Sequence, residues 1–150
     1  MPFRLSERAL RASTYKGRVL DPMEVMFLVL IMFSTLLQLA GNTQPTSIAL
    51  LLPSAFRTTW LVIMMLGSVA ALLGVFWPRR FVDGILLEIT GLTAVSFAVV
   101  IYGAAQMVAV TINHAALGGL MSGALTILLG LAFGLKALRL QGEIERLKKI

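Results

Sequence analysis

The chain alternates between long apolar stretches and short polar segments. Four stretches are nearly free of charged residues and cover 23–40, 60–77, 85–110 and 115–135. At a rise of about 1.5 Å per residue, each can cross a hydrocarbon core about 30 Å thick with some help from its flanks. Both faces of every stretch are apolar, whereas the strands of a membrane barrel alternate in polarity. The pattern therefore predicts an all-α integral membrane protein with four transmembrane helices.

Polar segments lie at both ends of the chain. Residues 1–21 form a basic arm, and residues 136–150 form a charged tail in which Arg139 and Glu143 have the i,i+4 spacing of a helical pair. The tail is therefore expected to be a helical extension. With 150 residues, the chain is expected to form a single membrane domain.

The basic residues are unevenly divided among the polar segments. Of the thirteen Lys and Arg residues, all but Arg57 fall before the first stretch, between the second and third, or after the fourth: Arg4, Arg8, Arg11, Lys16, Arg18, Arg79, Arg80, Lys136, Arg139, Arg146, Lys148 and Lys149. Positive residues flanking membrane spans stay in the cytoplasm. We therefore expect an antiparallel bundle in the cytoplasmic membrane, with both termini and the Pro78–Asp83 turn inside the cell.

The composition agrees with a membrane location. Hydrophobic residues make up 58% of the chain and charged residues 13%, about half the charged fraction of a soluble domain. The net charge of +6 comes from residues at the membrane edges, which favours contact with anionic lipids. A nucleic-acid partner is not expected, because no basic stripe is interleaved with aromatic residues.

Residues for catalysis or metal binding are scarce. The chain has no cysteine, and its one histidine, His114, stands in a short outer turn without an acidic neighbour. No phosphate-binding loop, nucleophile elbow or paired carboxylates occur. The sequence predicts neither an enzyme nor a cofactor.

Small residues recur at helical spacing and indicate where helices touch. In lipid, helix association depends on close packing rather than on the hydrophobic effect. We expect packing, and oligomerisation if it occurs, at Gly67, Gly74, Gly84, Gly91, Gly119, Gly123, Gly130 and Gly134. Contacts within one chain are the first expectation, since a four-helix protein must pack itself first.

Glu88 is an ionisable residue within a predicted span. A buried charge there needs a partner, and Lys136 or Arg139 would lie at the same depth on the last helix. We favour this structural pairing over a proton or cation site. Glu24 stands closer to the membrane edge and is interpreted as a cap of the first helix.

Aromatic residues are interpreted as membrane anchors. Trp60, Trp77 and Tyr102 are placed at helix ends, where amphipathic rings favour the headgroup level. Asp83 is expected to cap the third helix.

One part of the pattern resembles a known family. The run from Arg80 through Glu88, Gly91 and Leu92 to Tyr102, followed by a glycine-bearing last helix and a charged tail, is similar to small four-helix holin-like membrane proteins of actinobacterial tailed phages. The resemblance implies timed permeabilisation of the host membrane, by which a cell-wall hydrolase reaches its substrate. No predicted helix has a strongly polar face to line a hole, so lesions would require oligomerisation through the glycine faces.

Two other classes of function remain open. A small proton-coupled exporter also has four helices, but such carriers resemble this chain less, because they place an essential Glu near the middle of the first helix. A non-enzymatic accessory or scaffold protein for another membrane protein is the third alternative.

Overall fold

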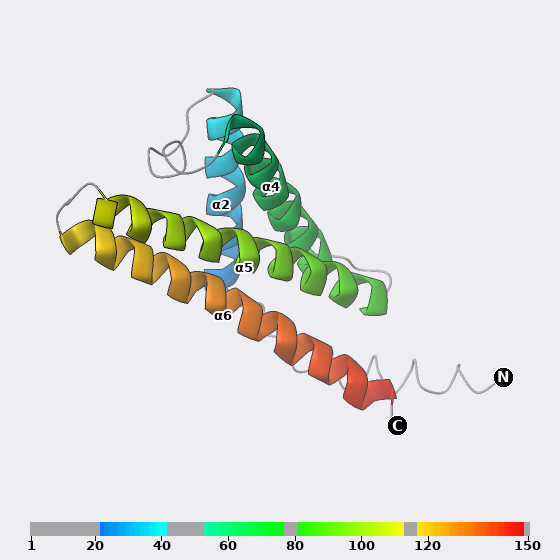
Figure 1. Ribbon diagram of the computed structural model, residues 1–150. Helices are drawn as coiled ribbons and strands as arrows, with labels where there is room; N and C mark the ends of the chain where they lie inside the picture. The colour runs from blue at the N-terminus through cyan, green and yellow to red at the C-terminus, as the bar shows by residue number, and fades with distance from the viewer. Residues whose placement is uncertain (1–21, 42–52, 77–80, 113–116, 149–150) are drawn as a thin grey trace.

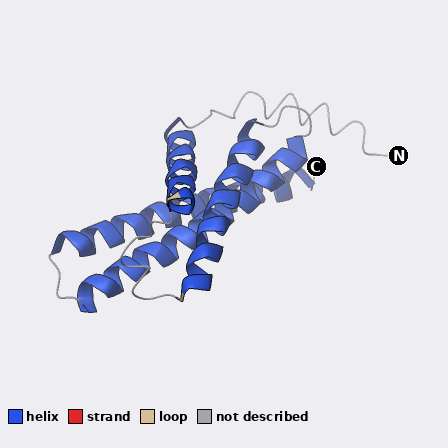
Figure 2. Cartoon of the chain, turned by 90° about the horizontal axis from the view of Figure 1, so that it is seen from above, coloured by secondary structure: helices blue, strands red, loops and turns tan. Residues whose placement is uncertain are grey.

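Four α-helices make up nearly all of the part of the chain that the structure describes. The computed structural model describes residues 22–41, 53–76, 81–112 and 117–148. Its helices are α2 (Pro22–Ala40), α4 (Ser54–Phe76), α5 (Phe81–Ile112) and α6 (Leu117–Lys148) (Figure 1). Figure 2 shows the same all-helical chain from above. The basic arm 1–21, Trp77, the Pro78–Arg80 part of the turn and His114 lie outside the described residues.

The helices begin earlier or end later than the apolar pattern predicts. α4 begins at Ser54 rather than at residue 60, because the Pro53 carbonyl accepts the N–H groups of Phe56 at 3.0 Å and Arg57 at 3.2 Å. Asp83 lies inside the first turn of α5 rather than at its cap position. α6 continues without a break into the charged tail as far as Lys148, as the spacing of the tail predicts.

Each of the four helices is long and apolar enough to cross a membrane. Their outward faces carry large apolar side chains, such as Leu30, Phe97 and Leu128, that are more than half exposed. Soluble proteins rarely expose apolar surface on this scale. These observations indicate a membrane protein, in agreement with the sequence.

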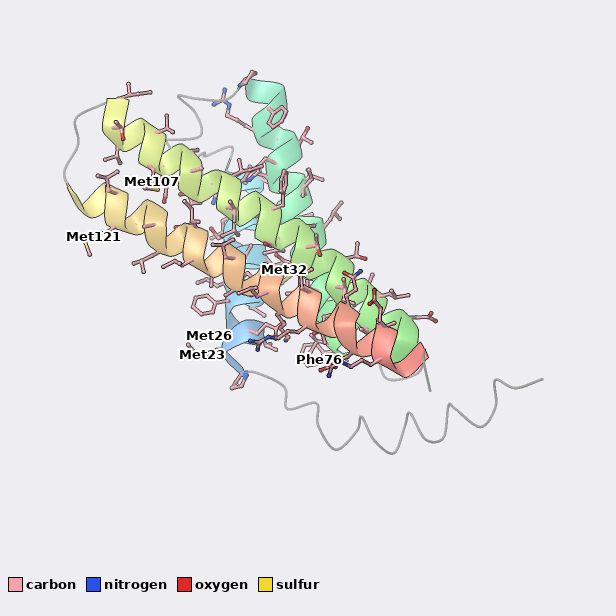
Figure 3. The ribbon with its side chains drawn as sticks, turned by 60° about the horizontal axis from the view of Figure 1, so that its bottom comes forward. Met23, Met26, Met32, Phe76, Met107 and Met121 are labelled. Atoms are coloured by element: carbon pink, nitrogen blue, oxygen red, sulfur yellow. The ribbon has the colours of Figure 1, made fainter. Side chains whose placement is uncertain are left out.

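α5 is the central helix and packs on two neighbours. Its face toward α4 includes Gly91 and Val95, which lie against Gly67. Its face toward α6 includes Ser96 and Val100, which lie against Gly130. Figure 1 shows α5 and α6 side by side along most of their length, and Figure 3 shows Met107 and Met121 near their connected end.

Side-chain hydrogen bonds also join these helices. The indole N–H of Trp60 on α4 donates to the carbonyl of Ala98 on α5 at 3.0 Å. The hydroxyl of Ser96 on α5 donates to the carbonyl of Gly130 on α6 at 2.7 Å. Interhelical hydrogen bonds in membranes contribute about 0.6 kcal/mol on average, so they add to packing rather than replace it.

Two of the three residues interpreted as membrane anchors, Trp60 and Tyr102, pack between helices instead. Trp60 is buried, and its ring lies 5.5 Å from that of Tyr102 with an interplanar angle of 37°. Tyr102 lies well inside α5, ten residues before its end at Ile112. Both residues belong to the interface between α4 and α5. The sequence could not distinguish an interfacial ring from one that packs inward on a neighbouring helix.

α2 is the least buried helix of the four. It crosses behind α5 and α6 in Figure 1 and packs mainly against α4. Only Glu24, Leu28 and Thr35 of this helix are buried. The Thr35 hydroxyl bonds to the carbonyls of Ile31 and Met32, both at 2.9 Å, within its own helix. In both of these bonds the hydroxyl donates within α2, so neither bond connects α2 to another helix.

The close approach of the α4 and α5 backbones at Gly91 predicts that substitutions at Gly91 and at Gly142 affect stability very differently. A Cβ atom at Gly91 would collide with the Ala71 nitrogen and lie 2.6 Å from the Gly67 carbonyl oxygen, whereas one at Gly142 would meet nothing within 4 Å. Gly91→Ala should lower the free energy of unfolding by about 1–3 kcal/mol, as overpacking does. Gly142→Ala is the control and should leave it unchanged or raise it by up to about 1 kcal/mol. Denaturant titration in detergent micelles, followed by circular dichroism, measures both. Equal stability of the two variants would contradict the packing of α4 on α5.

Candidate functional site

Three charged side chains from three helices meet inside the protein. Lys136 on α6 forms an ion pair with Glu24 Oε2 on α2. The same ammonium lies 3.6 Å from Glu88 Oε1 on α5. We call these residues, Glu24, Glu88 and Lys136, the ionic cluster. Figure 3 labels Met23 and Met26 at the end of α2 that supplies Glu24.

Glu24 and Glu88 each lie one helical turn before a leucine of the hydrophobic core. Leu28 follows Glu24 by four residues and Leu92 follows Glu88 by four, and both leucines are fully buried. Residues four apart share one helix face. Ala137, next to Lys136, is buried as well. The charged residues therefore lie on the same helix faces as the core residues and point toward the inside of the protein.

Gly74 on α4 determines how closely Glu88 approaches that helix. A Cβ atom at Gly74 would collide with the backbone nitrogen of Glu88 and lie 2.8 Å from its Cα. The backbone of α5 at Glu88 thus lies directly against α4. This contact leaves the Glu88 side chain at the centre of the helices, within reach of Lys136.

The cluster is buried on its acidic side and more open on its basic side. The side chains of Glu24 and Glu88 are 6% and 2% exposed, whereas that of Lys136 is 36% exposed. Charged groups within a membrane protein are costly and require partners. A lysine can meet this need from the edge, because its flexible stem lies along apolar surface while the ammonium reaches a polar group. Lys136 therefore compensates buried negative charge from two helices.

Of the two predicted partners of Glu88, the structure places Lys136 beside it. Lys136 is the residue beside Glu88, and Arg139 is exposed and forms no ion pair with any residue that the structure describes. Glu24 lies in the first turn of α2, as its interpretation as a cap requires, but its side chain is also buried and paired with Lys136. Its position one turn before Leu28 could have indicated an inward-facing side chain. Only the tilt of α2 across the other helices, which the sequence does not encode locally, brings it to Lys136.

The predicted glycines fall into two interfaces of a single chain. Gly67, Gly74 and Gly91 lie where α4 meets α5, and the carbonyl oxygen of Gly84 lies 2.6 Å from a Cβ built at Gly74. Gly119, Gly123, Gly130 and Gly134 face Val110, Met107, Val100 and Ser96 of α5. Gly103 was missed: a Cβ there would lie 2.8 Å from the Gly123 carbonyl oxygen. The glycines were predicted from small residues that recur at helical spacing, and Gly103 lies on the face of α5 toward α6, whereas Gly84 and Gly91 lie on the face toward α4.

The described residues also include polar groups away from the ionic cluster. Within residues 22–41, 53–76, 81–112 and 117–148, no group of three or more His, Cys, Asp or Glu residues could hold a metal ion. Gln38 Oε1 and Arg57 Nε are buried without a hydrogen-bond partner among those residues. They lie near the end of α2 and the start of α4, away from the ionic cluster.

Comparison of the chain with protein-family models, with curated proteins and with solved structures finds no significant match. The function must therefore be argued from the residues and their geometry.

The cluster predicts different roles for two neighbouring basic residues. Lys136→Met leaves the buried Glu24 carboxylate without its cation and should lower the free energy of unfolding by about 1–3 kcal/mol, the cost of an unsatisfied buried polar group. Arg139→Met, on the same helix but exposed, should change it by no more than about 0.5 kcal/mol. Chemical unfolding in micelles compares them directly. If Arg139→Met proved the more damaging substitution, Lys136 would not be the structural partner.

Proposed function

We propose that the chain spans the cytoplasmic membrane of a bacterial cell four times, as an antiparallel bundle with both termini inside. The uneven distribution of basic residues supports this orientation. The ionic cluster is consistent with it, because it joins the first turn of α2, the N-terminal part of α5 and the C-terminal part of α6. These are the helix ends that the basic residues assign to the cytoplasm.

The lengths of the last two helices suit this placement. α5 and α6 have 32 residues each, or about 48 Å at the helical rise. They exceed a hydrocarbon core of about 30 Å and must tilt or project from it. The polar residues of α6 from Arg139 onward support projection into the cytoplasm.

Within this arrangement, the protein acts as a holin-like permeabilising protein that assembles laterally in the membrane. The supporting observation is the outward face of α6, where Met121, Leu125, Leu128, Leu135 and Leu138 are all at least 60% exposed. These residues follow the helix for its whole membrane-spanning length. They provide apolar surface for contact with other copies of the chain.

The packing inside one chain places the proposed lesion between copies. The glycine contacts bring the backbones of α4, α5 and α6 together, and the core between the helices consists of residues such as Leu61, Leu92 and Val95. Lateral association through the glycine faces, which the sequence suggested, is thus replaced in our proposal by association through the outward leucine faces.

A proton-coupled exporter is the second candidate, because α2 carries a buried carboxylate, Glu24, although this residue lies in the first turn rather than near the middle of the helix. An exporter would use a pH gradient across the membrane of sealed vesicles to drive the transport of its substrate, without releasing a trapped dye. A holin-like protein would release the dye. An accessory protein would do neither.

The holin-like function is tested by induced expression in a bacterium. Membrane potential, followed with a voltage-sensitive dye, should collapse after a delay. Co-expression with a cell-wall hydrolase that lacks an export signal should then lyse the culture. Gly91→Leu, which separates α4 from α5, should abolish both effects, whereas Gly142→Leu should retain them, because a Cβ atom at position 142 would meet nothing within 4 Å.

Orientation and insertion serve as controls for this experiment. Reporter fusions after Ile150 should be active in the cytoplasm, and fusions near Pro45 should be active outside. An inserted, correctly oriented chain that leaves membrane potential and growth unchanged at high expression would refute the holin-like proposal.

A further inference from the structure

Glu24 has one carboxylate oxygen that lacks a hydrogen-bond donor. Its Oε2 atom is paired with Lys136, whereas Oε1 is buried and accepts no hydrogen bond from any described residue. The residue as a whole is 7% exposed. Buried polar atoms nearly always have a partner, and a buried anionic oxygen without one is costly. A proton on this carboxyl group removes the negative charge and thereby this cost.

We propose that Glu24 is a proton-binding site that controls the attachment of α2 to the rest of the protein. A proton from water on the cytoplasmic side adds to the Glu24 carboxylate, and the new O–H bond makes a neutral carboxylic acid. No other covalent bond changes. The Lys136 ammonium then loses its charge attraction to Glu24 and stays beside Glu88, from which it is 3.6 Å away.

The position of Lys136 between two carboxylates makes this exchange possible. Its ammonium already contacts both, and its side chain is 36% exposed, so it has room to move toward Glu88. Arg139 on α6 and Asp83 on α5 are exposed. Arg57, the only charged residue of α4, is near the start of that helix, whereas Gly74 contacts Glu88 close to its end. Among the described residues, Glu88 and Lys136 are therefore the charges that face Glu24.

α2 is the element that responds, because it is the least buried of the four described helices. Of its residues, only Leu28 and Thr35 are buried besides Glu24, and the Thr35 hydroxyl bonds within its own helix. The contact between Glu24 and Lys136 is the one ion pair between α2 and the other described helices. Neutralising Glu24 leaves α2 attached through its apolar contacts, which are mainly with α4, and the end of the helix that carries Glu24 separates from α6.

The natural absence of cysteine permits a direct measurement of this separation. Spin labels at Leu30→Cys on α2 and Gln141→Cys on α6 occupy exposed positions outside the proposed association face and leave the core untouched. Pulsed electron paramagnetic resonance on the labelled protein in lipid vesicles reports the distance between them. The distance should be longer and more broadly distributed at mildly acidic pH than at mildly alkaline pH.

Three substitutions separate the proton site from a purely structural ion pair. Glu24→Gln, which imitates the protonated acid, should give the long distance at both pH values. Lys136→Gln should do the same by removing the cation. Glu143→Gln removes an exposed carboxylate of α6 and should behave as the unaltered protein does.

An unchanged distance in the protein with native Glu24 and Lys136 would overturn the proposal, as would pH dependence that persists in Glu24→Gln. If Glu24→Gln does not insert, the native protein and Lys136→Gln still decide the question. The outcome is independent of lysis. A chain that permeabilises the membrane while α2 stays in place would retain the proposed function and lose this inference.

Discussion

The close approach of the α5 backbone to α4 and α6 is the contact on which the rest of the structure depends. Association of helices in lipid gains little from the hydrophobic effect, so it requires surfaces that fit at backbone distance. Gly74 and Gly91 provide this fit toward α4, and Gly123 and Gly130 provide it toward α6. The same approach gives the hydrogen bonds of Trp60 and Ser96 their acceptors. It also brings Glu88 beside α4, with Lys136 within reach on the other side. The position of the ionic cluster is therefore a consequence of glycine packing.

α2 joins this central unit in a different way. It has no comparable glycine interface and buries only a few residues. Its attachment combines an apolar contact with α4 and the ion pair between Glu24 and Lys136. A buried ion pair is weak evidence for stability, because the desolvation of the charges offsets their attraction, but the loss of one partner leaves the other at a high cost. The pair therefore fixes where α2 lies more than it stabilises the whole protein. This division between a tightly packed unit and a loosely attached helix underlies the proposed response to protons.

The sequence predicted where the helices lie along the chain better than it predicted which side of each helix faces its neighbours. Four helices, the helical tail and the packing role of the glycines followed from apolar stretches and spacing, which are local properties. The partner of Glu88 was narrowed to two residues because both stand at the same depth. The errors concern which direction a side chain faces. Glu24 was interpreted only as a cap, Trp60 and Tyr102 as anchors, and Gly103 was missed, since each assignment depends on how one helix is turned or tilted against another. On helices that are apolar on all sides, no polar face reveals that rotation. The proposed orientation in the membrane is based on the distribution of basic residues, and the proposed activity is based on the resemblance and on the outward face of α6.

The central claim is that Glu24 and Lys136 interact directly and hold α2 against the other helices. A double-mutant cycle measures this interaction most directly, with the free energies of unfolding in micelles of the unaltered protein, Glu24→Gln, Lys136→Met and the double variant. Direct contact predicts an interaction energy within the range of about 0.5–3 kcal/mol found for contacting residues, with the double variant less destabilised than the sum of the single variants. An interaction energy of zero, with the two effects strictly additive, would show that the residues do not contact each other and would contradict the account.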